Sequence, residues 1–117
     1  MAGDGVPNFT IEQHFNRLTP AEAERLAKLA EECAETIQII CKIQRHGYAS
    51  RNPDAGASRL TNREELEQEL GDIAAALRLM FEAGDLREAR FAAAAKAGLQ
   101  RMRPYMHHQG TGGERCD

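Results

Sequence analysis

The fold is decided by residues 19–47, TPAEAERLAKLAEECAETIQIICKIQRHG, which have a helical pattern and no helix breaker after the second position. Thr19 can cap a helix, Pro20 suits the first helical position, and Glu22 completes a capping box. Gly47 stands where the C-terminus of a helix favours glycine. We therefore expect one long helix that ends just before Gly47.

Apolar residues in this stretch recur at spacings of three and four, the pattern of a helix that buries one face. The expected buried stripe consists of Leu26, Leu29, Ala30, Cys33, Ile37, Ile40 and Cys41. A second helix is expected to open at Asn62, with Glu65 as its capping partner, and to end at Gly84. Its apolar stripe consists of Leu66, Leu70, Ile73, Leu77 and Met80.

The rest of the chain gives weaker signals. Asp85 and Glu88 have the spacing of a third capping box, which predicts a helix up to about Met102. A short helix is expected over 10–18, and the Gly-, Ser- and Pro-containing segment 47–61 predicts a long loop. No strand-like alternation is present, so the expected fold class is all-α: a bundle of largely antiparallel helices, four in number with one short.

The expected domain organisation is one helical domain with loose ends. Residues 9–108 form the domain, while 1–8 and 109–117 are expected to be flexible. Aromatic residues make up only 5% of the chain and Trp is absent, so a large self-contained core is not expected. A second subunit is then expected to cover the apolar positions, in a homo-oligomer.

Charge and hydropathy exclude several classes of protein. With 18 acidic and 15 basic residues, the chain lacks the strongly basic footprint of a nucleic-acid-binding protein. No apolar run approaches the length that spans a bilayer, so no membrane partner is expected. Three cysteines, two of them inside helical patterns, fit free thiols in a reducing compartment. These features favour a cytoplasmic protein.

The informative feature is the position of the acidic residues. Glu31, Glu32 and Glu35 lie in the middle of the first long helix, where Glu31 and Glu35 are about 6 Å apart along the axis and repel each other. Glu69 and Asp72 have a similar spacing on the second helix. Carboxylates that converge from two helices are unfavourable without a cation.

Two interpretations of these carboxylates stay open at this point. A hard divalent ion with oxygen ligands, Mg²⁺ or Mn²⁺, would relieve the repulsion. Alternatively, the glutamates are ordinary solvated side chains of helix surfaces. A di-iron carboxylate site is excluded, because it needs Glu-x-x-His and no histidine of this chain has Glu three residues before it.

The two acidic motifs resemble the signature of the all-α nucleoside triphosphate pyrophosphohydrolases, the MazG-like superfamily. That signature is Glu-Glu-x-x-Glu on one helix, here Glu31-Glu32-Cys33-Ala34-Glu35, and Glu-x-x-Asp on the next, here Glu69-Leu70-Gly71-Asp72. The resemblance covers roughly residues 26–108, and this stretch is similar to the compact single-domain members of the superfamily. It implies a four-helix-bundle-like domain that is completed by oligomerisation.

The resemblance also implies an activity. A (deoxy)nucleoside triphosphate would be hydrolysed to a monophosphate and pyrophosphate, as in housekeeping of the nucleotide pool. Mg²⁺ would be held by four metal ligands, while Glu31 would orient or deprotonate the attacking water. The implied metal ligands are Glu32, Glu35, Glu69 and Asp72.

Basic residues supply candidates for phosphate contacts. Lys42 and Arg45 follow Glu35 along the first helix. Cations near the C-terminus of a helix are also favoured by the helix dipole alone, without any ligand. Lys96 and Arg101 match a Lys and an Arg that members of the superfamily often carry, with Gln100 where Asn is often found.

Other segments offer further candidates without a choice among them. Arg51, Asn52 and Arg59 in the loop could close over a substrate. Aromatic side chains that could stack on a base are Phe9, Phe15, Tyr48 and Phe81. Two other functions stay open: a phosphoribosyl-ATP pyrophosphohydrolase, which shares the fold and the motif, and a non-catalytic helical interaction module.

Overall fold

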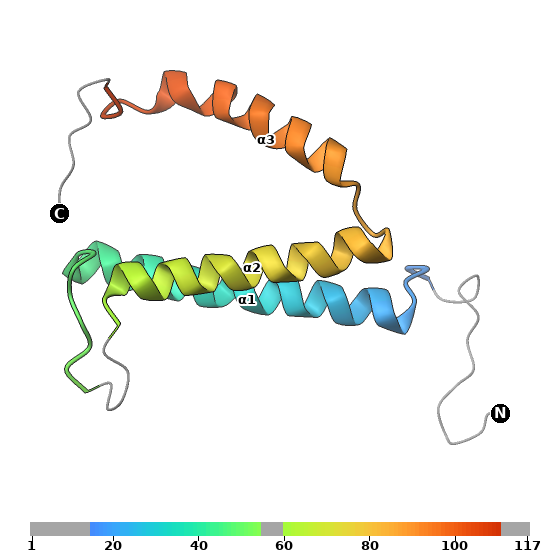
Figure 1. The fold of residues 1–117 in the computed structure, drawn as a ribbon, viewed down its shortest axis with the longest axis horizontal. Helices are drawn as coiled ribbons and strands as arrows, with labels where there is room; N and C mark the ends of the chain where they lie inside the picture. Colours follow the sequence, from blue (N-terminus) through green and yellow to red (C-terminus); the bar gives the residue numbers. More distant parts are fainter. Residues whose placement is uncertain (1–14, 55–59, 111–117) are drawn as a thin grey trace.

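The computed structural model describes residues 15–54 and 60–110, and it is helical throughout apart from turns and loops (Figure 1). Its elements are α1 (Pro20–His46), α2 (Asn62–Ala83), α3 (Glu88–Met102) and the 3-10 turn η1 (Arg103–Tyr105). The all-α prediction is confirmed. Within the described residues there is no helix over 15–18, where a turn is followed by irregular chain with Arg17 at φ +59°. The rest of the expected 10–18 helix, residues 10–14, lies outside the described part.

Helix α1 has the ends that the sequence predicts. The Thr19 hydroxyl accepts from the Glu22 backbone N–H at 3.1 Å, and the Glu22 carboxylate accepts from the Thr19 N–H at 2.8 Å. This reciprocal pair satisfies two backbone donors that a helix start leaves open. At the other end Gly47 has φ +87° and donates to the Ile43 carbonyl.

Helix α2 begins as expected, but the predicted cap was wrong by one residue. The cap is Thr61, whose hydroxyl accepts from the Glu64 N–H at 3.1 Å, while Glu64 accepts from the Thr61 N–H at 2.8 Å. Asn62 instead donates its amide to the Gly47 carbonyl at 2.9 Å. Glu65 is engaged elsewhere, with Lys42 at 2.6 Å.

The predicted Asp85–Glu88 capping box of the third helix was also wrong. The N-cap of α3 is Arg87, without a side-chain cap bond. Asp85 accepts two hydrogen bonds from the Arg25 guanidinium, at 2.5 and 2.9 Å, and Glu88 pairs with Arg78 at 2.9 Å. The Arg25 guanidinium offers Asp85 two parallel charge-assisted hydrogen bonds, which a single backbone N–H at a helix start does not match.

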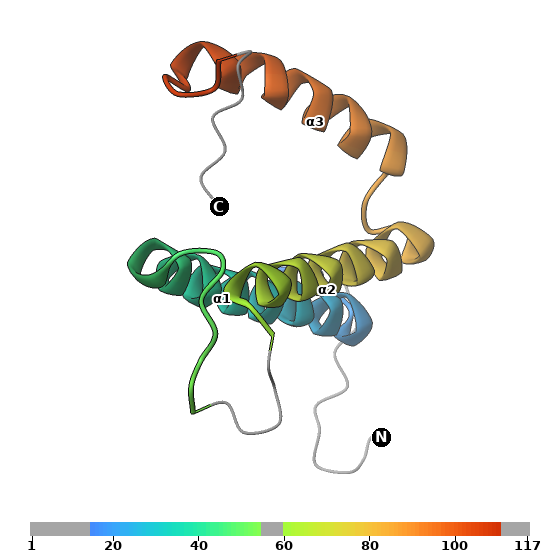
Figure 2. The same ribbon diagram turned by 60° about the vertical axis from the view of Figure 1, so that its left-hand side comes forward.

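The three helices do not form a closed bundle. α1 and α2 lie side by side and antiparallel, and both views show α3 extending away from this hairpin (Figures 1 and 2). α3 meets α2 close to the turn that joins them, where the rings of Phe81 and Phe91 stack edge-on at 5.4 Å. The radius of gyration is 19.7 Å, against about 13 Å for a compact domain of this size.

The core is correspondingly small. Among the described residues, the buried apolar side chains are Ala76 and Met80. The expected burial of the α1 stripe was wrong for most of its residues, since Leu29 alone among them is half-buried: Ile37 is 60% exposed, and both Cys33 and Cys41 are exposed free thiols. None of the described helices is long and apolar enough to cross a membrane.

Several sequence predictions fall on residues that the structure does not describe. These are the N-terminal segment 1–8, Phe9, the middle of the 47–61 loop with Arg59, and all but the first two residues of the 109–117 tail.

Candidate metal centre

The antiparallel packing of α1 and α2 brings together three of the five motif carboxylates. One carboxylate oxygen from each of Glu32, Glu35 and Glu69 lies within 4.8 Å of the other two. Glu32 and Glu35 are almost one turn apart on α1, so both point to the same side of that helix. Glu69 reaches them from α2. We call these three side chains the carboxylate cluster.

Two oxygens of the carboxylate cluster are buried without a hydrogen-bond partner: Oε1 of Glu32 and Oε2 of Glu69. Glu32 is only 4% exposed. A buried carboxylate oxygen without a donor is costly, and most buried polar atoms in proteins have a partner. The residues therefore fit a bound cation, which would supply the missing partner to both oxygens.

Electrostatics point in the same direction. Burial is the largest cause that raises the pKa of Glu69, and the negative charges of Glu35 and Asp72 raise it further. Burial also raises the pKa of Glu35, with the charge of Glu32 as the next cause. Carboxylates this close repel each other when both are charged, and a shared proton or a bound cation would relieve that repulsion. The three carboxylates could therefore hold a metal ion.

Lys28 is a partner of this site that the sequence reasoning missed. Its ammonium lies 2.9 Å from Oε2 of Glu32 and 3.0 Å from Oε1 of Glu31. Hydrogen bonds to Glu32 and then to Glu31 raise the pKa of Lys28. The signal was available, since Lys28 precedes these residues by three and four positions, the spacing of helical neighbours. Lys28 binds Oε2 of Glu32, and Oε1 of the same carboxylate is the buried oxygen without a partner.

The other two motif residues lie at the edge. Glu31 is exposed and its carboxylate turns to Lys28, outside the cluster. Asp72 is exposed on α2, almost one turn after Glu69, and is not among the oxygens that meet within 4.8 Å. Its negative charge still acts on Glu69. Both residues are close enough in sequence to members of the carboxylate cluster for their side chains to lie at its rim.

The basic candidates are not gathered at the carboxylate cluster. Lys42 is half-buried in its ion pair with Glu65, and Arg45 is exposed near the end of α1. Lys96 and Arg101 are exposed on α3, which extends away from the hairpin (Figure 1).

The aromatic candidates have partners of other kinds. Tyr48 lies under the guanidinium of Arg63, 4.9 Å from the ring centre. Phe81 packs against Phe91 at the start of α3, and Phe15 is 92% exposed. None of these rings lies at the cluster.

The donor set defines the chemistry of the site. Carboxylate oxygens alone, without nitrogen or sulfur ligands, suit hard divalent cations such as Mg²⁺, Mn²⁺ or Ca²⁺. No protein-family model matches the chain, and no curated protein or solved structure is significantly similar to it. The resemblance to the MazG-like superfamily therefore rests on the two acidic motifs of the sequence alone.

Proposed function

We propose that the chain is a Mg²⁺-dependent hydrolase that cleaves (deoxy)nucleoside triphosphates to a nucleoside monophosphate and pyrophosphate, with Mn²⁺ as an alternative ion. The observation that carries the proposal is the pair of buried carboxylate oxygens without partners, on Glu32 and Glu69, in a cluster that also includes Glu35. The two motifs on which the resemblance rests supply all three residues.

The residues take the following roles in this proposal. Glu32, Glu35 and Glu69 hold the cation, and Asp72 joins them from the next turn of α2. The cation supplies charge neutralisation, without which a triphosphate would not approach these carboxylates. Glu31, exposed at the rim, accepts a proton from the water whose oxygen forms the new bond to the α-phosphorus. The bond from that phosphorus to the bridging oxygen breaks, and pyrophosphate leaves with the electron pair.

Phosphate contacts would come from basic residues on both parts of the chain. Lys42 and Arg45 lie farther along α1 on the hairpin that carries the cluster. Lys96 and Arg101 lie on α3, so their contribution requires α3 to approach the cluster, most simply from a second copy. This fits the exposed apolar side chains of the hairpin and of α3, among them Leu79 and Leu99, which are 53% and 50% exposed.

We accordingly propose that two copies associate and bring their hairpins together as a four-helix arrangement. Sedimentation velocity of the full chain tests it: a homodimer or homotetramer is expected, and Ile37→Glu should shift the protein toward smaller species. A monomer at micromolar concentration would contradict the proposal.

The activity is tested by pyrophosphate release from eight nucleoside triphosphates in the presence of Mg²⁺. The variants Glu32→Gln and Asp72→Asn should lose activity, while Glu67→Gln, an exposed glutamate of α2 outside the cluster, should keep it. If wild type cleaves none of the eight with Mg²⁺ or Mn²⁺, the proposal is wrong. Phosphoribosyl-ATP would then be the next substrate to test, and after it a non-catalytic role.

A further inference from the structure

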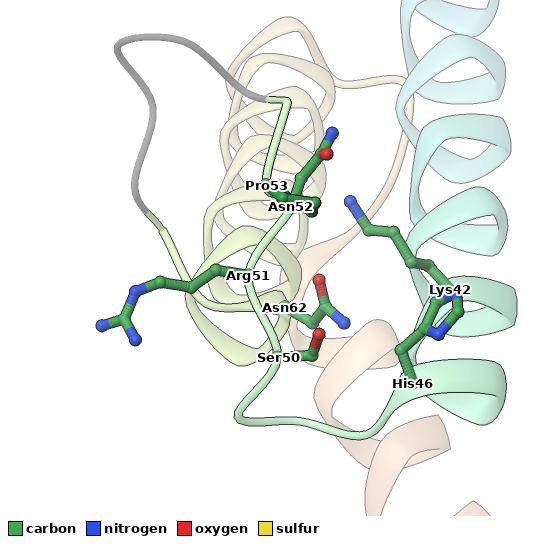
Figure 3. Close-up of a pocket in the computed structure, with 7 residues that line it drawn as sticks. All are labelled: Lys42, His46, Ser50, Arg51, Asn52, Pro53 and Asn62. Carbon is green, nitrogen blue, oxygen red and sulfur yellow. The ribbon is translucent and has the colours of Figure 1, made fainter.

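A second site lies at the end of the hairpin where α1 passes into the loop and the loop returns to α2. It is a pocket of about 240 Å³ lined by seven residues of α1, the loop and α2 (Figure 3). Lys42 and His46 contribute from α1, and Ser50, Asn52 and Asn62 face them from the loop and α2. Arg51 also lines the pocket, but its side chain points away from the other residues in the close-up.

The loop side of this pocket is fixed by hydrogen bonds to the start of α2. The Asn62 N–H donates to the Ser50 carbonyl at 2.8 Å, and the Arg63 N–H donates to the Tyr48 carbonyl at 3.0 Å. The Asn62 side chain, in a residue only 2% exposed, donates to the Gly47 carbonyl at 2.9 Å. These bonds hold the first half of the loop against the hairpin, so the pocket is built by the fold.

The pocket is polar with little net charge. Its two cationic residues are Lys42, which is paired with Glu65 at 2.6 Å, and Arg51, whose side chain points away from the other lining residues. The remaining groups are hydroxyl, imidazole and amide, which offer donors and acceptors. Asn52 accepts from the Asp54 N–H at 2.9 Å through Oδ1, which leaves its amide nitrogen as a donor. Such a lining suits an uncharged ring with hydrogen-bonding edges better than a phosphate.

The pocket and the carboxylate cluster share one side of the hairpin. On α1, Glu35 and Lys42 are seven residues apart, two turns, so they lie on one face about 10 Å from each other along the axis. On α2, Asn62 and Glu69 are likewise seven residues apart, so they also lie on one face of their helix. One ligand of nucleotide length can therefore reach from the cluster to the pocket.

The size of the pocket limits what part of the ligand it takes. Pockets that enclose a whole small-molecule ligand have about 300–1,000 Å³, more than this one. It has room for a single heterocycle whose remainder extends along the hairpin. The charged part of the ligand would then lie toward the carboxylate cluster, and the uncharged part at the loop.

We propose that this pocket binds the nucleobase of the substrate and selects among bases through the hydrogen-bonding groups of His46, Ser50 and Asn52. The inference rests on the proposed triphosphate hydrolysis and deepens it, since it assigns the base to the loop end of the hairpin. The side chain of Asn62 contributes by holding the loop, so it is a positioning residue.

Binding is tested first, on the full chain, by amide NMR titration in the presence of Mg²⁺. The probes are the four common ribonucleoside monophosphates, with ribose 5-phosphate as the matched ligand that lacks a base. We expect at least one monophosphate to shift the amide signals of Ser50 and Asn52, while ribose 5-phosphate leaves them unchanged. Equal shifts with ribose 5-phosphate, or no shift at these residues with any nucleotide, would overturn the assignment.

Selectivity is tested by the kcat/KM values for the eight triphosphates. Asn52→Ala and His46→Ala should reduce the ratio between the best and the worst base by about tenfold, because the lost hydrogen bonds are made to one base and not to another. Gln44→Ala, an exposed residue of α1 outside the pocket, should leave the ratio unchanged. A uniform fall for all eight substrates would contradict base recognition at this site.

The two tests separate this inference from the proposed function. If wild type cleaves no triphosphate, the hydrolase proposal fails, and the NMR titration still decides whether a base enters the pocket. If triphosphates are cleaved but the signals of Ser50 and Asn52 do not respond, the hydrolase proposal stands and the pocket assignment fails.

Discussion

Replacing Glu69 by Gln should stabilise the protein when no divalent cation is present, and should make its stability nearly independent of an added divalent cation. Oxygens of Glu69 and Glu32 lie within 4.8 Å, where two unit charges repel by about 3 kcal/mol at an effective dielectric constant of about 20. The ammonium of Lys28, 2.9 Å from Glu32, offsets part of this repulsion. We therefore expect Glu69→Gln to raise the free energy of unfolding in EDTA by about 1–2 kcal/mol.

A bound cation should reverse the order of the two proteins. An ion present at a hundred times its Kd stabilises the wild type by about 2.7 kcal/mol, and the variant, which lacks one carboxylate, gains much less. Urea unfolding followed by circular dichroism, with EDTA or with Mn²⁺ and at one fixed protein concentration, measures all four values. In thermal melts each kcal/mol corresponds to about 4 °C for a chain of this size.

The matched control is Glu67→Gln, which removes an exposed charge of α2 away from the cluster. It should behave like wild type in EDTA and in Mn²⁺. If Glu69→Gln and wild type gain the same stability from Mn²⁺, the carboxylate cluster is not a cation site. If Glu69→Gln is less stable than wild type in EDTA, the repulsion argument itself is wrong.

Three further predictions follow from other features. The pKa of Glu69 is raised in the fold, so the stability that comes from its bound proton is fully present below about pH 4.5 and is lost as the pH rises through the raised pKa. In EDTA the stability advantage of Glu69→Gln over wild type should therefore shrink on acidification. Urea midpoints between pH 7 and pH 4.5 measure this. Arg25 lowers the pKa of Asp85, so this ion pair stabilises the fold above the ordinary pKa of Asp, and the stability is lost as the pH falls through the lowered pKa. Arg25→Ala should therefore lower the urea midpoint at pH 7 and make the midpoint less dependent on acid pH. An unchanged midpoint at pH 7 would contradict the role of the pair. Gly84 has φ +85° at the end of α2, so Gly84→Ala should cost about 1–2 kcal/mol, and a variant as stable as wild type in urea would refute this.

The helices were predictable because their signals are local. Thr19, Pro20 and Glu22 lie within one turn, and nothing distant competes for them, so the start of α1 followed from the sequence. The cap of α2 was equally local, because Thr61 and Glu64 have the spacing of a capping box one residue before the predicted pair. The cap of α3 failed for the opposite reason. Whether Asp85 caps a helix depends on Arg25, which is 60 residues away in sequence, and a motif of four residues carries no information about such a partner.

The carboxylate cluster could be predicted from the sequence, whereas the position of α3 relative to it could not. Helical spacing places Glu32 and Glu35 on one face, and antiparallel packing of two helices joined by a loop brings Glu69 opposite them. The position of α3 could not be predicted, because its apolar face has no complement within the described chain. For that reason it could not be decided from the sequence whether Lys96 or Arg101 reaches the carboxylates.

The thin core has a practical consequence for any experiment on this protein. A chain whose buried apolar residues amount to Ala76 and Met80 in its described part retains little free energy of folding by itself. In the proposed association, the partner copy that covers Ile37 and Leu79 would contribute a large share of the stability, and mass action would make that share grow with concentration. Melting temperatures should then rise with protein concentration, and assays of the proposed activity at nanomolar dilution would measure dissociation as well as hydrolysis.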